Sequence, residues 1–299
     1  MTPDQQGAPK VSVCMIAYKH EAYIRQAIES ILAQEVDFPI ELVIGDDSSP
    51  DGTAAICEEF ARRDPRVRLL PRERNLGVMP NFTRTLLACT GEYIAVCEGD
   101  DYWTDTNKLS KQVAFLDSHP DYAGSAHQAT VISVNKADRP FRDNVRADLS
   151  TNDLLGGRLF HTASIVFKRA ALDLFCNSPQ VLSCDRLLNI CISILGQIKY
   201  FKESMCVYRI HGAGMSSLVT SEQLKLDLNC IPYLKQISSI FPDSRYKSYV
   251  FATIGLWKGT RPLQRLQYLA LSIIYSFSYF PENVLDGVKY IWKSPTRRT

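Results

Sequence analysis

The chain has 299 residues, of which 45% are hydrophobic and 22% are charged, which is the usage of an ordinary globular protein. Lys and Arg together number 34 and Asp and Glu 32, so the formal net charge of +2 excludes the basic footprint of a dedicated nucleic-acid-binding protein. The composition also excludes a disordered chain, a collagen-like repeat and a disulfide-dense miniprotein.

The first 135 residues alternate between strand and helix patterns. Short apolar runs typical of buried strands lie at 11–17, 40–44, 67–70 and 92–97. Helical patterns lie between them and after them, at 24–32, 53–63, 81–89 and 107–118. Strands that alternate with helices need crossover connections, so the order predicts an α/β fold with a largely parallel sheet.

The second half of the chain has shorter and more varied patterns. Residues 122–134, 162–167, 198–201 and 205–210 are strand-like, and 186–195 is helical. Residues 136–150 are polar and without periodicity, which predicts a loop or hinge of the kind that moves over active sites. After Ser217 the pattern is helical, so we expect a catalytic domain at 1–217 and a C-terminal helical region at 218–299.

The most apolar stretch of the chain is Leu263–Phe280. It contains Gln, Arg and several Ser, and it is short for a bilayer span of about 20 predominantly apolar residues. We interpret it as a packing helix. The alternative is an amphipathic helix at a membrane surface, favoured by the nearby cations Lys289, Lys293, Arg297 and Arg298.

The cysteines and the N-terminus indicate a reducing compartment. The nine cysteines are an odd number, and no two have the C-x-x-C spacing of a zinc or redox site. We expect reduced thiols that pack as small apolar groups in a cytoplasmic protein. The first ten residues, MTPDQQGAPK, contain no apolar core of a secretion signal.

Two acidic clusters follow predicted strands. Asp46-Asp47 comes after the second strand and Glu98-Gly99-Asp100-Asp101 after the fourth, so both fall at the carboxyl edge of the sheet, where ligands bind. Like charges gathered there are costly unless a cation or a hydrogen-bonding ligand compensates them, and carboxylates suit Mg²⁺ or Mn²⁺. Either cluster alone is equally compatible with helix capping. The loop Tyr18–Glu21 has no glycine, which excludes a Rossmann fingerprint or a P-loop.

Four segments together resemble the family 2 glycosyltransferases of the GT-A fold. They are VSVCMIAYKHEAYIRQAIESILAQ (11–34), ELVIGDDSSPDGT (41–53), YIAVCEGDDYWTDTNKLSKQV (93–113) and MCVYRIHGAGMS (205–216). The resemblance covers residues 11–217. It implies a Rossmann-like nucleotide-binding half with a mostly parallel central sheet, followed here by a C-terminal helical extension.

The resemblance implies a nucleotide-sugar donor site built from the loops that follow the strands. Asp46 or Asp47 would accept a hydrogen bond from the base, and Asp100 would bind the Mn²⁺ or Mg²⁺ that bridges the two phosphates. Glu98 departs from the commoner Asp of the D-x-D motif, and its longer side chain would reach a ribose hydroxyl or a metal-bound water. The other residues implied on the donor side are Ala17, Tyr18, Glu21, Gly99, Asp101, Arg209 and His211.

The resemblance also implies the catalytic groups. Asp185, which opens a helix, would be the general base for the acceptor hydroxyl, with an ordinary helix N-cap as the alternative. Arg209 and His211 would contact the diphosphate, and His211 would also be a metal ligand. His161 and Trp103 would line the acceptor side, although Trp103 fits core packing equally well. A single attack on one face of the sugar predicts inversion at the anomeric carbon.

The function implied is transfer of a sugar, with a UDP-sugar as the default donor, to a glycan or lipid-linked oligosaccharide acceptor of a bacterial surface polysaccharide. The C-terminal helices would touch the inner face of the plasma membrane, and no nucleic acid is expected as a partner. One alternative is a non-catalytic protein that binds nucleotide-sugars or acts as a scaffold. A sugar-phosphate nucleotidylyltransferase is the other, but it would carry a glycine-rich first turn that Tyr18–Glu21 lacks.

Overall fold

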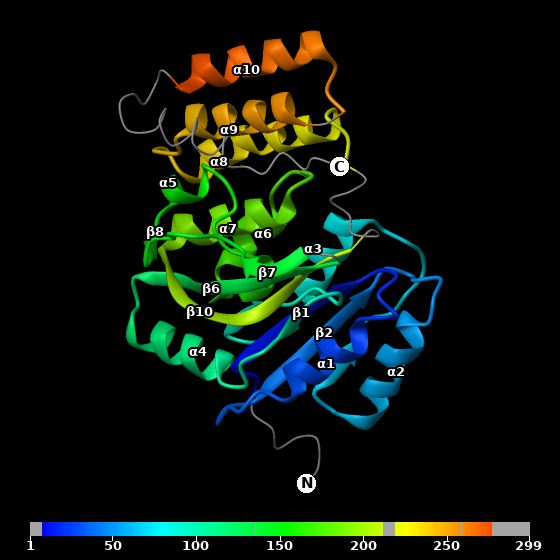
Figure 1. Cartoon of the computed structure of the whole chain (residues 1–299). Coiled ribbons are helices and arrows are strands. Elements are labelled where there is room, and N and C mark those ends of the chain that lie inside the picture. The colour runs from blue at the N-terminus through cyan, green and yellow to red at the C-terminus, as the bar shows by residue number, and fades with distance from the viewer. Residues whose placement is uncertain (1–7, 135, 212–218, 258, 277–299) are drawn as a thin grey trace. The chain divides into compact units, whose positions relative to one another are not determined.

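A mixed sheet runs through the part of the computed structural model that is described, residues 8–134, 136–211, 219–257 and 259–276 (Figure 1). Its order is β3-β2-β1-β4-β9-β6-β10-β5, with β7 paired to β6 and β8 to β10. The strands are β1 (Val11–Ala17), β2 (Ile40–Asp46), β3 (Val67–Leu69), β4 (Tyr93–Val96), β5 (Tyr102–Trp103), β6 (Tyr122–Ser133), β7 (Lys136–Pro140), β8 (Asp148–Leu149), β9 (Val166–Lys168) and β10 (Gln197–Ile210).

Helices connect the strands and make up the C-terminal region. Those before β10 are α1 (Ile24–Leu32), α2 (Thr53–Arg63), α3 (Val78–Ala88), α4 (Lys108–Ser118), α5 (Thr151–Leu154), the 3-10 helix η2 (Thr162–Ser164), α6 (Ala171–Cys176) and α7 (Cys184–Leu195). Those after it are the 3-10 helix η4 (Gln223–Cys230), α8 (Ile231–Ile237), α9 (Asp243–Leu256) and α10 (Pro262–Ser276).

Strands β3, β2, β1 and β4 are parallel and form the Rossmann-like half that the sequence predicts. Alternate residues of a strand face opposite sides, so Val13 and Met15 of β1 share the buried core with Ile28 of α1. Gly45 of β2 faces the other side, where a Cβ atom would collide with Thr85 of α3. Helices therefore cover both faces of this half, which confirms the α/β fold class.

The other half of the sheet is mixed, because β9 lies antiparallel between β4 and β6 while β6 and β10 are parallel. Three elements of this half differ from the sequence predictions. The stretch 136–150 is not simply a loop, since its backbone pairs as β7 and β8 although the side chains of β7 are all exposed. The strand expected at 162–167 begins only at Val166, after η2. The two short strands expected at 198–210 are one strand, β10, with bulges between Phe201 and Cys206.

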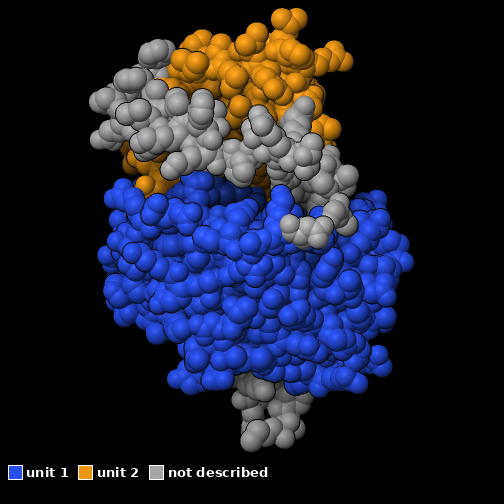
Figure 2. Space-filling model, in the orientation of Figure 1, with its two compact units in different colours: residues 1–151, 158–177, 185–214 blue, residues 152–157, 178–184, 215–299 orange. Residues whose placement is uncertain are grey.

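The chain divides into two compact units, coloured separately in Figure 2. Unit 1 comprises residues 1–151, 158–177 and 185–214 and contains the sheet. Unit 2 comprises 152–157, 178–184 and 215–299 and contains η4 and α8–α10. Within unit 2, α9 and α10 are joined by the hydroxyl of Ser248, which donates to the Ser272 carbonyl at 3.0 Å. Among the described residues, none of the helices combines the length and apolarity that crossing a bilayer requires. The predicted helix at 263–280 is α10, and its last four residues lie outside the described part of the chain.

Candidate functional site

The loops that carry both acidic clusters meet at the carboxyl edge of β1. The Asp47 amide donates to the Ala17 carbonyl at 2.9 Å, and the Gly99 amide donates to the Ile16 carbonyl at 3.0 Å. Strand β1 lies between β2 and β4, so these bonds hold the two loops on either side of its end. A Cβ atom on Gly99 would lie 2.5 Å from Cδ1 of Ile24, so any other residue here would have to displace the buried Ile24 side chain.

The loop that follows β1 is tied to the loop that follows β2. Lys19 has a left-handed backbone conformation, with φ of 60°, and its amide donates to the Ser49 hydroxyl at 3.0 Å. One oxygen of the Glu21 carboxylate accepts the Gly52 amide at 3.0 Å and so helps hold the two loops together. Tyr18 is 41% exposed and presents its ring to solvent. An aromatic face at this edge suits stacking on a planar base.

Asp46 and Asp47 are both buried and both hold loops in place. Asp47 accepts the backbone amides of Leu76 and Gly77 at 2.7 and 2.9 Å. Asp46 accepts the Ser49 amide at 3.2 Å and pairs with the Arg72 guanidinium at 3.2 Å. The two aspartates therefore shape the second wall of the site, and any contact they make with a base uses lone pairs left over from these bonds.

Asp100 lies among cations and imidazoles. Its Oδ2 is 3.0 Å from Nε2 of His211 and 3.6 Å from Nε2 of His20. Arg209 donates to the Asp100 carbonyl at 2.6 Å and lies 4.4 Å from the ring centroid of Tyr102. The sequence predicted Asp100, Arg209 and His211 at this site, and the structure brings them together, because β10 returns beside β5. His20 was not predicted.

Glu98, Asp101 and His161 form a second, more deeply buried cluster. Each has a ligand atom within 4.8 Å of the others, and His161 lies 2.5 Å from Oδ2 of Asp101. The other oxygen of Asp101 accepts the Arg209 amide at 2.9 Å, so Asp101 is fully engaged. Burial lowers the pKa of His161, but the adjacent Asp101 outweighs it and the net direction is upward.

Glu98 is the unsatisfied member of that cluster. Its Oε2 is buried and has no hydrogen-bond partner among the described residues. Burial raises the pKa of Glu98 to about 7, and His161, 4.0 Å away, partly opposes the shift. A buried carboxylate oxygen without a donor is costly. Glu98, Asp101 and His161 together, and Asp100 with His211, offer the oxygen and imidazole ligands that a divalent cation takes, so the residues present fit one.

Asp185 opens α7 and faces a cation that the sequence did not reveal. Its Oδ2 lies 3.3 Å from Nη2 of Arg158 and 3.4 Å from the Thr162 hydroxyl. Burial raises the pKa of Asp185, but the nearby Arg158 and Arg186 lower it by more, so the carboxylate is held ionised. Arg158 lies in an irregular loop, where no periodic pattern could have placed it beside Asp185.

Two residues expected on the acceptor side are buried. Trp103 is 4% exposed and its indole donates to the Ala163 carbonyl at 2.9 Å, so the core-packing alternative holds for this residue. His161 is 2% exposed and stacks on Tyr208, with ring centroids 4.3 Å apart.

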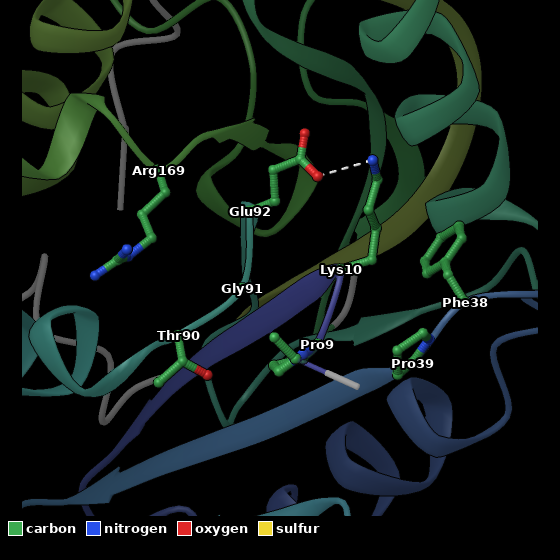
Figure 3. Close-up of a pocket in the computed structure, with 9 residues that line it drawn as sticks. Pro9, Lys10, Phe38, Pro39, Thr90, Gly91, Glu92 and Arg169 are labelled. Atoms are coloured by element: carbon green, nitrogen blue, oxygen red, sulfur yellow. Dashed lines mark hydrogen bonds and ion pairs between the residues drawn. The ribbon is translucent and has the colours of Figure 1, made fainter. Parts of the chain in front are cut away.

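A pocket of about 630 Å³ lies at the opposite edge of the sheet (Figure 3). Lys10, Pro39 and Glu92, which line it, immediately precede β1, β2 and β4. Figure 3 shows Lys10 joined to Glu92, and this ion pair spans 2.9 Å. The amino edge of a parallel sheet is the edge that open α/β folds do not use for ligands, so we separate this pocket from the site.

The sequence is similar to one protein family and to several known bacterial proteins. The family described as Glycosyl transferase family 2 matches residues 12–172. An uncharacterised protein of Mycobacterium tuberculosis (strain ATCC 25618 / H37Rv) is 41% identical over 69% of this chain and 60% of its own length. The chain thus spans about three fifths of that relative. The minor teichoic acid biosynthesis protein GgaB of Bacillus subtilis (strain 168) is 27% identical over 80% of this chain and 27% of its own.

The solved structures that share the fold include two with a bound nucleotide-sugar. Residues 1–349 of S. aureus TarS in complex with UDP-GlcNAc superpose with a TM-score of 0.61, at 18% identity, over 93% of this chain and 95% of that one. The mannosyltransferase PcManGT of Pyrobaculum calidifontis, in complex with GDP-Man and Mn²⁺, gives 0.56, at 16% identity, over 97% and 81%. The GT-A fold expected from the sequence is therefore confirmed.

Proposed function

Because the chain belongs to glycosyl transferase family 2, we propose that it transfers a sugar from a nucleotide-diphosphate donor, a UDP-sugar by default, to a glycan of a bacterial surface polysaccharide. The observation that carries the proposal is the convergence of Asp100, Arg209 and His211 at the end of β4, beside the unsatisfied Glu98. The biosynthetic role named for GgaB and the nucleotide-sugars bound to TarS and PcManGT support the substrate class.

The donor site uses both acidic loops. We assign Ala17, Tyr18 and Glu21 to the base and ribose, against the wall held by Asp46 and Asp47. Asp100 and His211 would hold Mn²⁺ or Mg²⁺, which when bound stabilises the charge that develops on the departing diphosphate. Gly99 lets the backbone approach the donor. The Asp101 carboxylate accepts the backbone amide of Arg209 and so keeps Arg209 in position. The cationic Arg209 then stabilises the leaving group from the protein side.

Asp185 completes the reaction as the general base. Its carboxylate is held ionised and is 26% exposed, so it is accessible to an acceptor hydroxyl. Asp185 takes the proton as the acceptor oxygen attacks the anomeric carbon and the bond to the diphosphate breaks. One displacement on the face opposite the leaving group inverts the anomeric configuration. We assign this chemistry to residues 1–217.

The first experiment is calorimetric titration with UDP, GDP, CMP and dTDP, with and without Mn²⁺. We expect UDP to bind in a Mn²⁺-dependent manner, and Asp100→Asn to abolish that dependence. Asp37→Asn is the matched control, because Asp37 is exposed and lies just before β2, at the opposite edge of the parallel half of the sheet. Binding of UDP that ignores the metal would move neutralisation of the diphosphate to Arg209 and His211. If no nucleotide binds, the transferase proposal is wrong.

We further propose that the C-terminal helical region, 218–299, contacts an anionic membrane surface and brings the enzyme to a lipid-linked oligosaccharide acceptor at the inner face of the plasma membrane. Helix α10 carries an apolar stripe on one face, with Leu263 83%, Leu266 68%, Ile273 58% and Ile274 59% exposed. The stretch 244–281 contains no Asp or Glu and five Lys or Arg. An exposed apolar stripe in a cationic stretch suits the surface of a bilayer with anionic lipids.

Vesicle flotation tests this contact. The chain should float with phosphatidylglycerol-containing vesicles and less with pure phosphatidylcholine. Leu263→Gln combined with Leu266→Gln should reduce flotation, whereas Leu87→Gln, at a site in unit 1 that is 61% exposed, should not. Equal flotation of all three proteins, or none with either lipid, would exclude membrane contact through α10.

A further inference from the structure

The guanidinium of Arg158 is placed beside the proposed base with most of its hydrogen-bonding capacity unused. Its Nη2 lies 3.3 Å from both Oδ2 of Asp185 and the hydroxyl of Thr162. Within the described part of the chain, Nη1 and Nε make no hydrogen bond. The side chain is 40% exposed, and its guanidinium carbon lies 5.5 Å from the centroid of the Phe141 ring. The Arg158 guanidinium is therefore held at Nη2 by Asp185 and Thr162, while part of the side chain is exposed to solvent.

This pairing keeps Asp185 ionised but lowers its strength as a base. A carboxylate paired with a guanidinium is a weaker base than a free one, because the pair is lost when the carboxylate takes a proton. Arg186 adds a second positive charge near the same carboxylate. Asp185 would therefore become a stronger base if Arg158 found another partner once the acceptor is bound.

The partner that fits a guanidinium with free N–H groups is an oxyanion, since phosphate and carboxylate match its planar fork of donors. We propose that Arg158 is a specificity-determining residue that binds an anionic group, a phosphate or a carboxylate, on the acceptor glycan. The anion draws Arg158 away from Asp185 and leaves the carboxylate free to accept the hydroxyl proton. A neutral acceptor leaves the Arg158–Asp185 pair closed and reacts slowly.

This inference rests on the proposed function, and its consequence is a selection rule. Acceptors that carry a phosphate or a carboxylate near the reacting hydroxyl bind and react, while their neutral counterparts are poor substrates. The selection comes from one residue that touches both the acceptor and the base. It does not require a large basic surface, which agrees with the formal net charge of only +2.

Two matched pairs of acceptor fragments test the proposal on the protein loaded with UDP and Mn²⁺. The pairs are ribitol 5-phosphate with ribitol, and methyl glucuronide with methyl glucoside, and binding is measured by ligand-observed NMR. We expect at least one anionic member to bind about tenfold more tightly than its neutral partner. The pair that shows the preference tells whether the anion is a phosphate or a carboxylate.

Variants then assign the preference to Arg158. Arg158→Gln should remove it, and Arg158→Lys, which keeps the charge but not the fork, should retain part of it. Arg63→Gln, at an exposed arginine of α2, should leave it unchanged. Equal binding of anionic and neutral fragments by the wild-type protein, or a preference that survives Arg158→Gln, would overturn the inference while UDP binding still supports the proposed function. Absence of UDP binding would overturn both.

Discussion

The buried amine of Lys108 gives the stability of this fold an unusual dependence on pH. Lys108 begins α4 and is completely buried. Its Nζ donates to Oε1 of Gln112 at 2.8 Å and lies 4.1 Å from the centroid of the Trp103 ring. Burial lowers the pKa of Lys108 from its ordinary value of 10.5 to about 7. The folded chain therefore releases this proton at a lower pH than the unfolded chain does.

The sign follows from proton linkage. Between pH 7 and 10.5 the unfolded state binds the proton of Lys108 and the folded state does not, so stability rises as the pH rises. Below pH 7 both states are protonated and the dependence flattens. With these two pKa values, the contribution of Lys108 to the free energy of unfolding increases by roughly 2 kcal/mol between pH 7 and pH 9.

Urea denaturation of the wild type and of Lys108→Met at pH 7, 8 and 9 measures this term. The thiols and other groups that titrate in this range are common to both proteins and cancel in the difference. We expect the wild type to gain about 2 kcal/mol relative to Lys108→Met from pH 7 to pH 9. Lys111→Met, at an exposed lysine of the same helix, should track the wild type. A difference that does not change with pH would show that Lys108 stays charged in the folded protein, and the reasoning from burial would fail.

Three further substitutions test the site. Asp185→Asn should lower kcat by about 10²–10⁴ while UDP affinity is unchanged, as measured by transfer rates and calorimetry, and full activity would exclude Asp185 as the base. Gly99→Ala places a Cβ atom 2.5 Å from Cδ1 of Ile24, so thermal unfolding should report a loss of about 1–3 kcal/mol, and an unchanged Tm would mean that the loop moves freely. Asp47→Ala leaves the backbone amides of residues 76 and 77 without their acceptor. UDP affinity should therefore fall, and these two amides should exchange hydrogen faster. Unchanged exchange would refute the role of Asp47 in holding that loop.

Side-chain periodicity predicted the parallel half of the fold well. The bounds of β1 and α2 agree with the apolar runs at 11–17 and 53–63, because these elements bury one face or both. It failed for β7, whose five side chains are all exposed, so that only backbone pairing with β6 defines it as a strand. It also divided β10 in two, because the bulges between Phe201 and Cys206 carry exposed polar side chains that resemble a turn.

The candidate site also has a part that could be predicted from the sequence and a part that could not. The meeting of the loops after β2 and β4 follows from strand order and could be expected from the alternation of strands and helices. The pairing of Arg72 with Asp46 and of Arg158 with Asp185 could not be expected, because both arginines lie in irregular loops. An arginine in an irregular loop does not contribute to the apolar periodicity of a helix or strand. The carboxylate with which it pairs depends on the tertiary structure alone.

The route of the chain between β4 and β5 has a consequence for how the protein comes apart. β4 belongs to the parallel half, whereas β5 pairs with β10 at the far end of the sheet, so residues 97–101 connect one half of the sheet to the other. This connection is covalent and joins the parallel half to the mixed half, in addition to the hydrogen bonds between neighbouring strands. Glu98 and Asp100 lie in this connection, so separation of the two halves would displace both side chains. A ligand that binds residues 97–101 only in the folded protein would therefore stabilise both halves of the sheet against unfolding.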